Sequence, residues 1–384
     1  MSEKRKFVKE WSRGGLTMTG LCRKFGISRQ TGYKWVKRWR DFGCCDDALV
    51  EFCRTPHSHP WATDPDVVDL LVRTRKARPR WGPLKLRSWL MERDPKLELP
   101  APSTIGSILK KHGLTNRRTR RRRTPASVEP LSRCDAPNAV WCTDFKGDFR
   151  IGSGERVYPL TLMDAHSRFL IRCEALENTS SEACLPIFES AFREFGLPES
   201  IRSDNGSPFA SKGAGGLTAL SAWWAKLGIR HERIEPGKPQ QNGRHERMHR
   251  TLKAETAMPP RSSWRAQQRA FDRFRKEYNE ERPHESLGNK TPASRYVGSS
   301  RSLERSPDRM EYPFGDLVLR LDKLGRTKLG RRTVHVSKAL AHEYVLFERI
   351  DDHCWELHYG DVLLGYFDLT KTGHSLVQPG RNRK

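Results

Sequence analysis

The chain lacks several features that would place it in common functional classes. No apolar run among its 384 residues approaches the ~20 that a membrane-spanning helix needs. The first residues, MSEKRKFVKEW, contain no apolar signal region, so we expect a cytoplasmic protein. The nine cysteines include no CxxC pair, which argues against a disulfide framework and favours reduced thiols. Neither a GxxxxGKS/T phosphate loop nor a GxSxG nucleophile motif occurs.

Acidic residues are scarce relative to basic ones. Lys and Arg number 71 against 46 Asp and Glu, which gives a net charge of +25 and a pI near 10.0. Residues 1–135 hold 31 of the basic residues and 14 of the acidic ones, so the first third carries most of the excess. A chain this basic, with a mean hydropathy of −0.76, is expected to bind a polyanion. Its length favours several domains over one.

The densest positive charge is an arginine tract inside residues 115–135. Its members are Arg117, Arg118, Arg120, Arg121, Arg122 and Arg123. Like charges repel, so we expect residues 115–135 to form an extended linker. With helical segments on both sides, the tract is expected to follow DNA phosphates. The alternative is a solvated or nuclear-targeting tract.

Residues 1–42 have the pattern of a helix-turn-helix domain. Helices are expected over residues 4–12, 17–25 and 29–39, with a tight turn at Gly26 and Ser28 as the N-cap of the third. The outward face of that third helix is expected to reach base edges and phosphates. It carries Arg29, Gln30, Thr31, Lys34 and Lys37. The alternative is an ordinary three-helix unit with a charged surface.

Residues 63–114 predict a second DNA-binding module, of helix-turn-helix or winged-helix type. Helices are expected over residues 67–75, 84–91 and 103–112, with Gly113 ending the last. The outward face of the last helix carries Thr104, Lys110 and Lys111, which we expect to contact DNA.

Strands and helices alternate from residue 136 onward. Strands are expected over residues 139–145, 156–164, 169–176, 200–203 and 229–234, and helices over 181–195, 223–227, 245–254 and 264–280. Residues 136–298 therefore predict a mixed sheet with helices on its faces. Residues 313–384 alternate short strands and turns, which predicts a small all-β barrel.

Three carboxylates of the central region lie where a metal site can form. Asp144 is on a strand, Asp204 follows a short strand, and Glu246 opens a helix. If they meet at one sheet edge, they could hold two hard cations roughly 4 Å apart, which serve phosphoryl transfer. Arg250 and Lys253 share the helix face of Glu246 and would contact a polyphosphate strand. Weaker candidates for the acidic positions are Asp148, Asp164 and Glu232.

The same helix contains a rival motif. His245-Glu246-Arg247-Met248-His249 satisfies H-E-x-x-H, the zinc-protease signature. A protease would leave Asp144, Asp204 and the basic first third without a role. The hypothesis that we prefer instead gives His245 and His249 a DNA contact, a place beside the site or a purely structural role.

The motifs of the central region resemble a known family. They are Trp141-Cys-Thr-Asp144, Ser203-Asp204-Asn205-Gly206 and Gly237-Lys-Pro-Gln-Gln-Asn242-Gly-Arg-His-Glu246, followed by Leu252-Lys253 and Tyr278-Asn279-Glu280-Glu281-Arg282-Pro283-His284. This region resembles the retroviral-integrase-type (DDE) core of bacterial insertion-sequence transposases, with family 481 as the closest resemblance. One departure is the 41 residues between Asp204 and Glu246, a longer spacing than in many relatives, which we assign to a Gly-rich stretch at 211–221.

The resemblance implies a multidomain α+β protein with an RNase H-like core, and two Mg²⁺ or Mn²⁺ ions held by Asp144, Asp204 and Glu246. It further implies a bacterial, nucleoid-associated transposase that binds the terminal inverted repeats of its element. The enzyme would cleave the element ends and join the 3′-OH groups to target DNA, as a dimer or larger oligomer assembled on DNA. The alternative function is a DNA-binding regulator built on an inactive core.

Overall fold

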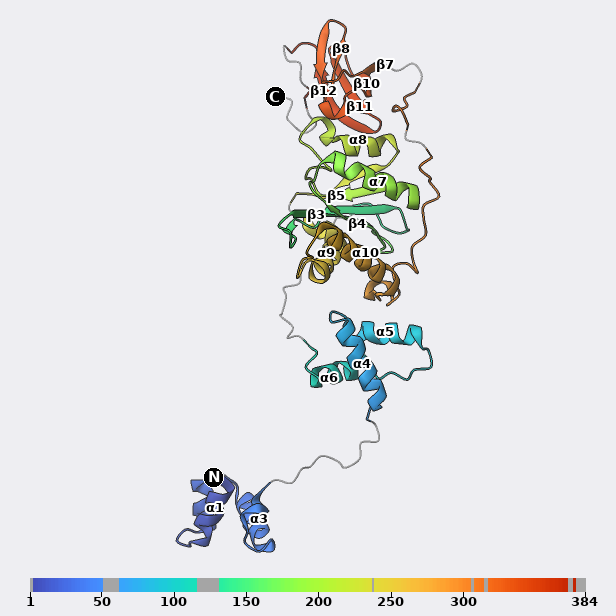
Figure 1. The fold of residues 1–384 in the computed structure, drawn as a ribbon. Helices are drawn as coiled ribbons and strands as arrows, with labels where there is room; N and C mark the ends of the chain where they lie inside the picture. Colours follow the sequence, from blue (N-terminus) through green and yellow to red (C-terminus); the bar gives the residue numbers. More distant parts are fainter. Residues whose placement is uncertain are drawn as a thin grey trace. The chain divides into compact units, whose positions relative to one another are not determined.

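The computed structural model describes residues 3–50, 62–115, 131–236, 238–304, 307–313, 317–371 and 376–377. The chain divides into two compact units, residues 1–64 and 65–384, each with its own core (Figure 1). The arginine tract at 117–123 lies outside the described residues, so its expected path along DNA stays a prediction.

The first unit is a three-helix domain with the expected caps. Its helices are α1 (Glu3–Ser12), α2 (Met18–Lys24) and α3 (Arg29–Asp41), followed by a 3-10 turn, η1 (Asp46–Leu49). The hydroxyl of Ser28 accepts a hydrogen bond from the Thr31 amide and so fixes the start of α3. Gly32 allows α3 to lie close to α2, because a Cβ there would come 2.6 Å from the Cys22 sulfur. Its core is one cluster in which Phe7, Leu21 and Val36 are buried, with Phe25, Ile27 and Trp35 packed against them.

The second unit begins with another three-helix module. It contains α4 (Pro65–Ala77), α5 (Pro83–Arg93) and α6 (Pro102–Lys111), and prolines open α5 and α6 where the first-turn N–H groups need no partner. Leu71, Trp81, Leu86 and Ile105 form its buried core. No strand occurs between residues 62 and 115, so the structure gives no wing and the winged-helix option is not supported.

A mixed sheet organises the central region. Its strands are β1 (Val140–Phe145), β2 (Phe149–Arg150), β3 (Arg156–Asp164), β4 (Leu170–Leu176), β5 (Ser200–Ser203) and β6 (Arg230–Arg233). Strands β1, β3 and β4 form an antiparallel meander, while β5 pairs parallel with both β1 and β6. The order along the sheet is β4-β3-β1-β5-β6, with the short β2 attached to β3.

Helices cover both faces of this sheet (Figure 1). On one face, α7 (Ser181–Phe195) and α8 (Ala219–Lys226) bury Phe188, Phe192 and Trp224 against the strands. On the other face lie α9 (Gly243–Thr256) and α10 (Trp264–Lys276), which continues into one π turn, η4 (Glu277–Glu281). The expected alternation of strands and covering helices is confirmed.

The C-terminal region is all β but differs from the expected barrel. Its strands are β7 (Leu317–Arg320), β8 (Arg326–Leu329), β9 (Arg332–His335), β10 (Tyr344–Arg349), β11 (Cys354–Tyr359) and β12 (Val362–Asp368). They form an open sheet in the order β12-β11-β10-β7 and a separate β8–β9 ribbon. Among residues 317–371 the pairing therefore does not close into a barrel. A single core that includes Val334, Leu357 and Phe367 joins the two sheets.

The long stretch between Asp204 and Glu246 docks this β region onto the core. Ala214 and Leu217, near a 3-10 turn, η2 (Ala214–Gly216), belong to the same buried cluster as Phe367. Lys226 at the end of α8 forms an ion pair with Glu343 of the β region. The Gly-rich segment at 211–221, to which the sequence analysis assigns the longer spacing, thus forms the surface on which the C-terminal sheets pack. We call this surface the seat.

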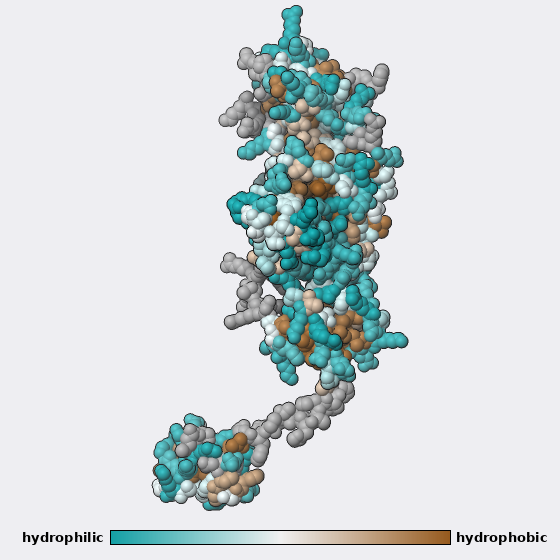
Figure 2. Space-filling model, viewed as in Figure 1, coloured by the Kyte–Doolittle hydropathy of each residue, from teal (hydrophilic) through white to brown (hydrophobic). Residues whose placement is uncertain are grey.

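The surface agrees with the composition. Figure 2 shows a mainly hydrophilic face over the core, with hydrophobic side chains in small, separate patches. Within the described ranges, the longest helices are too short or too polar to cross a bilayer.

Candidate active site

The pairing of β1 with β5 sets the positions of two of the three predicted carboxylates, Asp144 and Asp204. The parallel register joins Val140 with Ser200 and Cys142 with Arg202, an offset of 60 residues. The same offset brings Asp144 opposite Asp204, and side chains at these even positions point to one face of the sheet. The face is the one that α9 covers, because Asp144 pairs across β3 with Thr161, which contacts α9.

A tight turn presents Asp204 at the end of β5. The Asp204 carboxylate accepts a hydrogen bond from the Gly206 amide, an Asx turn that orients it. A Cβ at position 206 would lie 3.2 Å from a carboxylate oxygen of Asp204, so glycine leaves that oxygen accessible. Asn205 donates from its amide to the carbonyl of Ile234, which ties the turn to the end of β6.

Glu246 enters from the other side, in the first turn of α9. It is exposed and lines a cavity of about 640 Å³ together with Asp144 and His249. Basic side chains line the same cavity: Lys146, Arg250 and Lys253. Asp204 is not among the lining residues, but its charge acts on Asp144.

The charges of both other carboxylates affect the pKa of Asp144. Burial, the largest cause, and the charges of Asp204 and Glu246 together raise the pKa of Asp144 from 3.8 to about 7. A hydrogen bond from the Phe145 amide and the charge of Lys146 act in the opposite direction. The carboxyl of Asp144 is thus held where its negative charge is costly, and a cation would relieve that cost.

The three carboxylates suit hard divalent cations, although they stand apart. They offer only oxygen donors, the ligands that Mg²⁺ and Mn²⁺ prefer. Their oxygens do not all lie within 4.8 Å of one another; in the described part of the chain, only Glu348, Glu356 and His358 form such a group. Mutual repulsion of uncompensated anions keeps such groups separated.

The two histidines of the H-E-x-x-H motif do not form a zinc site. His245 and His249 are 0% and 3% exposed, and both Nε2 atoms contact the Thr161 hydroxyl, at 2.7 and 2.6 Å. Burial lowers the pKa of His245 to about 3 and that of His249 well below its ordinary value. Their rings pack edge to face inside the domain, while Glu246 faces the cavity. The protease hypothesis is therefore not supported.

The lower-ranked acidic candidates all have structural partners. Asp148 forms an ion pair with Arg156 on the β2–β3 hairpin, at 3.1 Å. Asp164 is fully buried and accepts hydrogen bonds from the amide and hydroxyl of Ser167, which anchors the turn after β3. Glu235, also within reach in sequence, pairs with Lys238 and Gln241.

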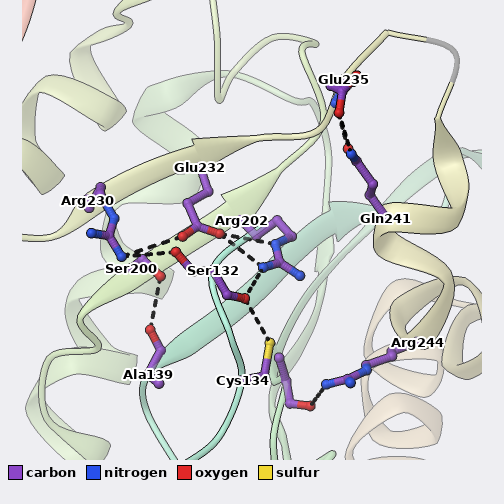
Figure 3. Close-up of polar contacts among 11 residues, drawn as sticks. Ser132, Cys134, Ala139, Ser200, Arg202, Arg230, Glu232, Glu235, Gln241 and Arg244 are labelled. Atoms are coloured by element: carbon purple, nitrogen blue, oxygen red, sulfur yellow. Dashed lines mark hydrogen bonds and ion pairs between the residues drawn. The ribbon is translucent and has the colours of Figure 1, made fainter. Parts of the chain in front are cut away.

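Glu232 belongs to a buried ion pair (Figure 3). Arg202 on β5 and Glu232 on β6 point toward each other, 3.0 Å apart, and each side chain is 8% exposed. Arg202 also donates to the carbonyl of Ser132, and Arg230 donates to the Ser132 hydroxyl. This pair thus fastens the chain where it enters the core, and Glu232 is not available as a ligand.

Lys146 is the cavity residue that the sequence reasoning missed. It lies two positions after Asp144, and strand alternation places positions 144 and 146 on one face. That spacing was the available signal. Its charge also lowers the pKa of Asp144, His245 and His249.

The expected DNA-contact residues of the helical modules lie at the surface. On α3, Arg29, Gln30, Lys34 and Lys37 are exposed and Thr31 is half-buried. On α6, Thr104, Lys110 and Lys111 are exposed, and on α9 so are Arg250 and Lys253. Their contacts with DNA remain predictions.

Comparison with known families identifies the class of domain. An integrase core domain matches residues 135–239 and again residues 227–292, and a helix-turn-helix domain matches residues 3–50. The chain therefore contains an integrase-type core of the RNase H-like fold, preceded by a helix-turn-helix domain.

Relatives by sequence include proteins of insertion elements and viral polyproteins. An insertion element IS407 protein of 31.7 kDa from Burkholderia multivorans is 29% identical over 205 residues, which cover 53% of this chain and 71% of that protein. An insertion element IS476 protein of 39.2 kDa from Xanthomonas euvesicatoria is 28% identical over 225 residues, 58% of this chain and 62% of that protein. The Gag-Pol polyprotein of gibbon ape leukemia virus is 31% identical over 121 residues, 32% of this chain and 7% of that protein.

Solved structures that align with part of the chain include viral integrases. The HTLV-2 integrase catalytic core domain in complex with magnesium aligns with 42% of this chain and 97% of its own, at 16% identity and a TM-score of 0.33. A simian T-cell lymphotropic virus intasome chain aligns with 76% of this chain and 97% of its own, at 15% identity and a TM-score of 0.38.

The chain combines a helix-turn-helix domain with an integrase core domain and is similar to proteins of bacterial insertion elements. The resemblance is confirmed at that level. Membership of family 481 stays a prediction.

Proposed function

We propose that the chain is a DNA transposase that binds the terminal inverted repeats of its insertion sequence, cleaves at the element ends and joins the freed 3′-OH groups to target DNA. The observation that carries this proposal is the arrangement of carboxylates. Asp144 lies where the β1–β5 register faces Asp204, and the charges of Asp204 and Glu246 both raise its pKa. Carboxylates whose charges act on Asp144, beside a basic cavity, suit chemistry on a phosphodiester.

The catalytic residues of this proposal are Asp144, Asp204 and Glu246. They would hold two Mg²⁺ or Mn²⁺ ions, which would supply Lewis acidity for the attacking and leaving oxygens of an in-line displacement. Lys146, Arg250 and Lys253 line the cavity beside them and would bind phosphate oxygens of the scissile strand. The same residues serve both steps, first with water and then with the 3′-OH as nucleophile, so no covalent bond between protein and DNA is needed.

DNA recognition is assigned to the N-terminal modules. Exposed residues of α3 would read the terminal repeat in the major groove, and those of α6 would contact a second stretch of the same end. Joining two element ends in concert requires at least two subunits, so we propose a homo-oligomer, a dimer or larger, assembled on DNA. The cell compartment that follows is the bacterial nucleoid.

The decisive experiment uses a labelled duplex that carries the terminal repeat of the element encoding this chain. With Mg²⁺, the wild-type protein should release a 3′-OH at the element end, and Asp204→Asn should remove that activity while leaving binding intact. Full cleavage by Asp204→Asn would overturn the assignment. Salt-sensitive end binding without cleavage under any divalent metal would instead identify a DNA-binding regulator.

A further inference from the structure

The motif at residues 278–284 has no part in the proposed active site, yet the core holds it rigidly. It begins inside the π turn η4. Asn279 is buried and fastens this turn to β4, because its side chain donates to the Leu170 carbonyl at 2.9 Å and accepts from the Leu170 amide at 2.8 Å. Arg282, also buried, forms an ion pair of 2.9 Å with Glu255 near the end of α9.

Acidic side chains of η4 meet arginines of the α4–α6 module, which belongs to the same compact unit as the core. Arg78, directly after α4, donates to the Glu281 carboxylate, and its Nε lies 4.0 Å from Glu277 Oε1. Arg93, at the end of α5, lies 3.7 Å from the Glu281 carboxylate. An acidic turn repels DNA phosphates, so in a chain of net charge +25 this surface suits a basic protein partner. The α4–α6 module is that partner.

The module holds Arg78 in place from its own side. The guanidinium lies 4.8 Å from the ring centroid of Trp81 and 4.3 Å from that of Trp89, and the side chain is 20% exposed. Stacking on two indoles fixes the direction of the guanidinium and keeps water from the ion pair. The contact with Glu281 is therefore arranged in advance, unlike a pairing of two mobile surface side chains.

A second contact lies beside the active-site cavity. Arg80 Nη2 donates to the Ala254 carbonyl at 3.1 Å, and Ala254 lines the cavity together with Glu246. The docked module therefore reaches the side of α9 from which Glu246 enters the site.

Lys85 on α5 belongs to the same interface. Burial lowers its pKa from 10.5 to about 8, and the charges of Glu255 and Glu285 on the core oppose that shift. Both carboxylates thus act on an ammonium group of the module.

The DNA face of the module stays free in this arrangement. Thr104, Lys110 and Lys111 on α6 are exposed, and none of them takes part in the contacts with η4 or α9. DNA bound on α6 is then held by a body that is fixed relative to the cavity. The distance between the recognised sequence and the cavity is thereby set by the protein.

We propose that Glu281 is a positioning residue: together with Glu277 it docks the α4–α6 module on the core, and so determines which phosphodiester of the bound element end enters the cavity. The inference rests on the proposed function, since it takes the module as a DNA-binding unit and the cavity as the cleavage site. It gives the motif at residues 278–284 the role of a docking surface.

Docking is measured first, on the full chain without DNA or metal. Carbodiimide crosslinks between Lys85 and Glu255 or Glu285 are quantified by mass spectrometry. Glu281→Gln and Arg78→Gln should each shift the docking equilibrium toward the open state by about 10-fold, because each removes a charge-assisted hydrogen bond, and the crosslink yield should fall. The double variant should lose little more than either single one. Unchanged yields, or losses that add up in the double variant, would refute the proposal.

The matched control is Glu280→Gln, which makes the same change of charge one residue earlier. Glu280 is exposed and makes no ion pair within the described part of the chain. Its variant should keep the wild-type crosslink yield, and a loss equal to that of Glu281→Gln would show that only the net charge of η4 matters and would overturn the role of Glu281.

Cleavage of a labelled element end with Mg²⁺ is the second readout. Wild type and Glu280→Gln should cut one bond. Glu281→Gln should bind the end with wild-type affinity but spread its cuts over neighbouring bonds, because the module is no longer fixed relative to the cavity. A single cut at the wild-type bond by Glu281→Gln would refute the proposal. Loss of end binding together with cleavage would indicate a purely structural role and would refute it as well.

The two readouts separate this inference from the proposed function. Absence of any cut by the wild-type protein would reject the proposed function, whereas the crosslinks test the docking by themselves. If Glu281→Gln does not fold, Glu277→Gln and Arg93→Gln replace it, since these side chains are 39% and 58% exposed. Wild-type crosslink yields in both would then refute the proposal.

Discussion

Removing the charge of Asp144 should stabilise the metal-free core. Burial and the neighbouring Asp204 and Glu246 raise its pKa from 3.8 to about 7. Each pKa unit corresponds to about 1.4 kcal/mol, so the ionised carboxyl costs the fold up to about 4 kcal/mol at pH 8. We therefore expect Asp144→Asn to raise the free energy of unfolding of the core by up to that amount.

The pH dependence gives this prediction its sign. The folded-state pKa lies above the unfolded one, so between about pH 4 and pH 7 the folded protein binds more protons, and wild-type stability falls as pH rises through that window. The advantage of Asp144→Asn should thus be almost nil below pH 4, about 2 kcal/mol at pH 5 and largest above pH 7.

The assay is urea unfolding of the full chain, with EDTA present to remove metal ions. Hydrogen exchange is measured on peptides from β1, β3 and β4, so that only unfolding of the core is followed. Asp148→Asn serves as the control, because that carboxylate is 40% exposed in a surface ion pair with Arg156 and should change stability by less than about 1 kcal/mol. An Asp144→Asn core no more stable than wild type at pH 8, or a gain of equal size at pH 3.5 and pH 8, would refute the reasoning.

Three other predictions follow from contacts elsewhere in the chain. Arg202→Met should lower core stability by about 3–5 kcal/mol, because it leaves the Glu232 carboxylate buried with only its 3.6 Å contact to Arg230; urea unfolding measures this, and a neutral effect would contradict it. Leu217→Ala should lower the free energy of unfolding by about 2–5 kcal/mol, because it removes a buried side chain from the seat. It should also speed proteolytic separation of the C-terminal sheets from the core, measured by mass spectrometry, and an unchanged cleavage rate would show that the seat is not needed. Ser28→Ala should cost about 1 kcal/mol in thermal unfolding of residues 3–50, since α3 loses its cap, and an unaltered midpoint would dispute that cap.

Local signals predicted much of the fold. The bounds of α7 follow from the sequence because the Ser180 hydroxyl caps its start and Gly196, with φ of 78°, ends it. Strand β3 was predicted with its full length, since its apolar and β-branched residues outweigh the single Pro159 among its nine residues. Strand β8 was missed because Arg326–Leu329 is short and polar, with no apolar run to mark it.

Local sequence signals could not predict which segments far apart in the chain pair with each other. The sequence indicates that Asp144 lies on a strand and that Asp204 follows one, but only the parallel pairing of β1 with β5 brings these two segments side by side. The seat formed by Ala214 and Leu217 is likewise a contact with β12, more than 140 residues later in the chain. Such contacts depend on tertiary packing, which composition and periodicity do not encode.

The histidines of α9 show how helical periodicity bears on the roles that the sequence left open for them. His245, Met248, His249 and Leu252 are spaced as one buried helical stripe, and all four are buried. Glu246, Arg250 and Lys253 occupy the exposed face of the same helix. Helical periodicity therefore separates the two histidines from Glu246, whereas the H-E-x-x-H pattern groups them.

The most direct test of the account compares glutamates in a strand-joining assay. A pre-cut element end with a free 3′-OH, a plasmid target and Mg²⁺ report joined product for wild type, Glu246→Gln, Glu232→Gln and Glu235→Gln. The account predicts that Glu246→Gln alone abolishes joining in folded protein. Joined product from Glu246→Gln at the wild-type rate, or its loss only in Glu232→Gln or Glu235→Gln, would contradict the assignment of the catalytic carboxylates.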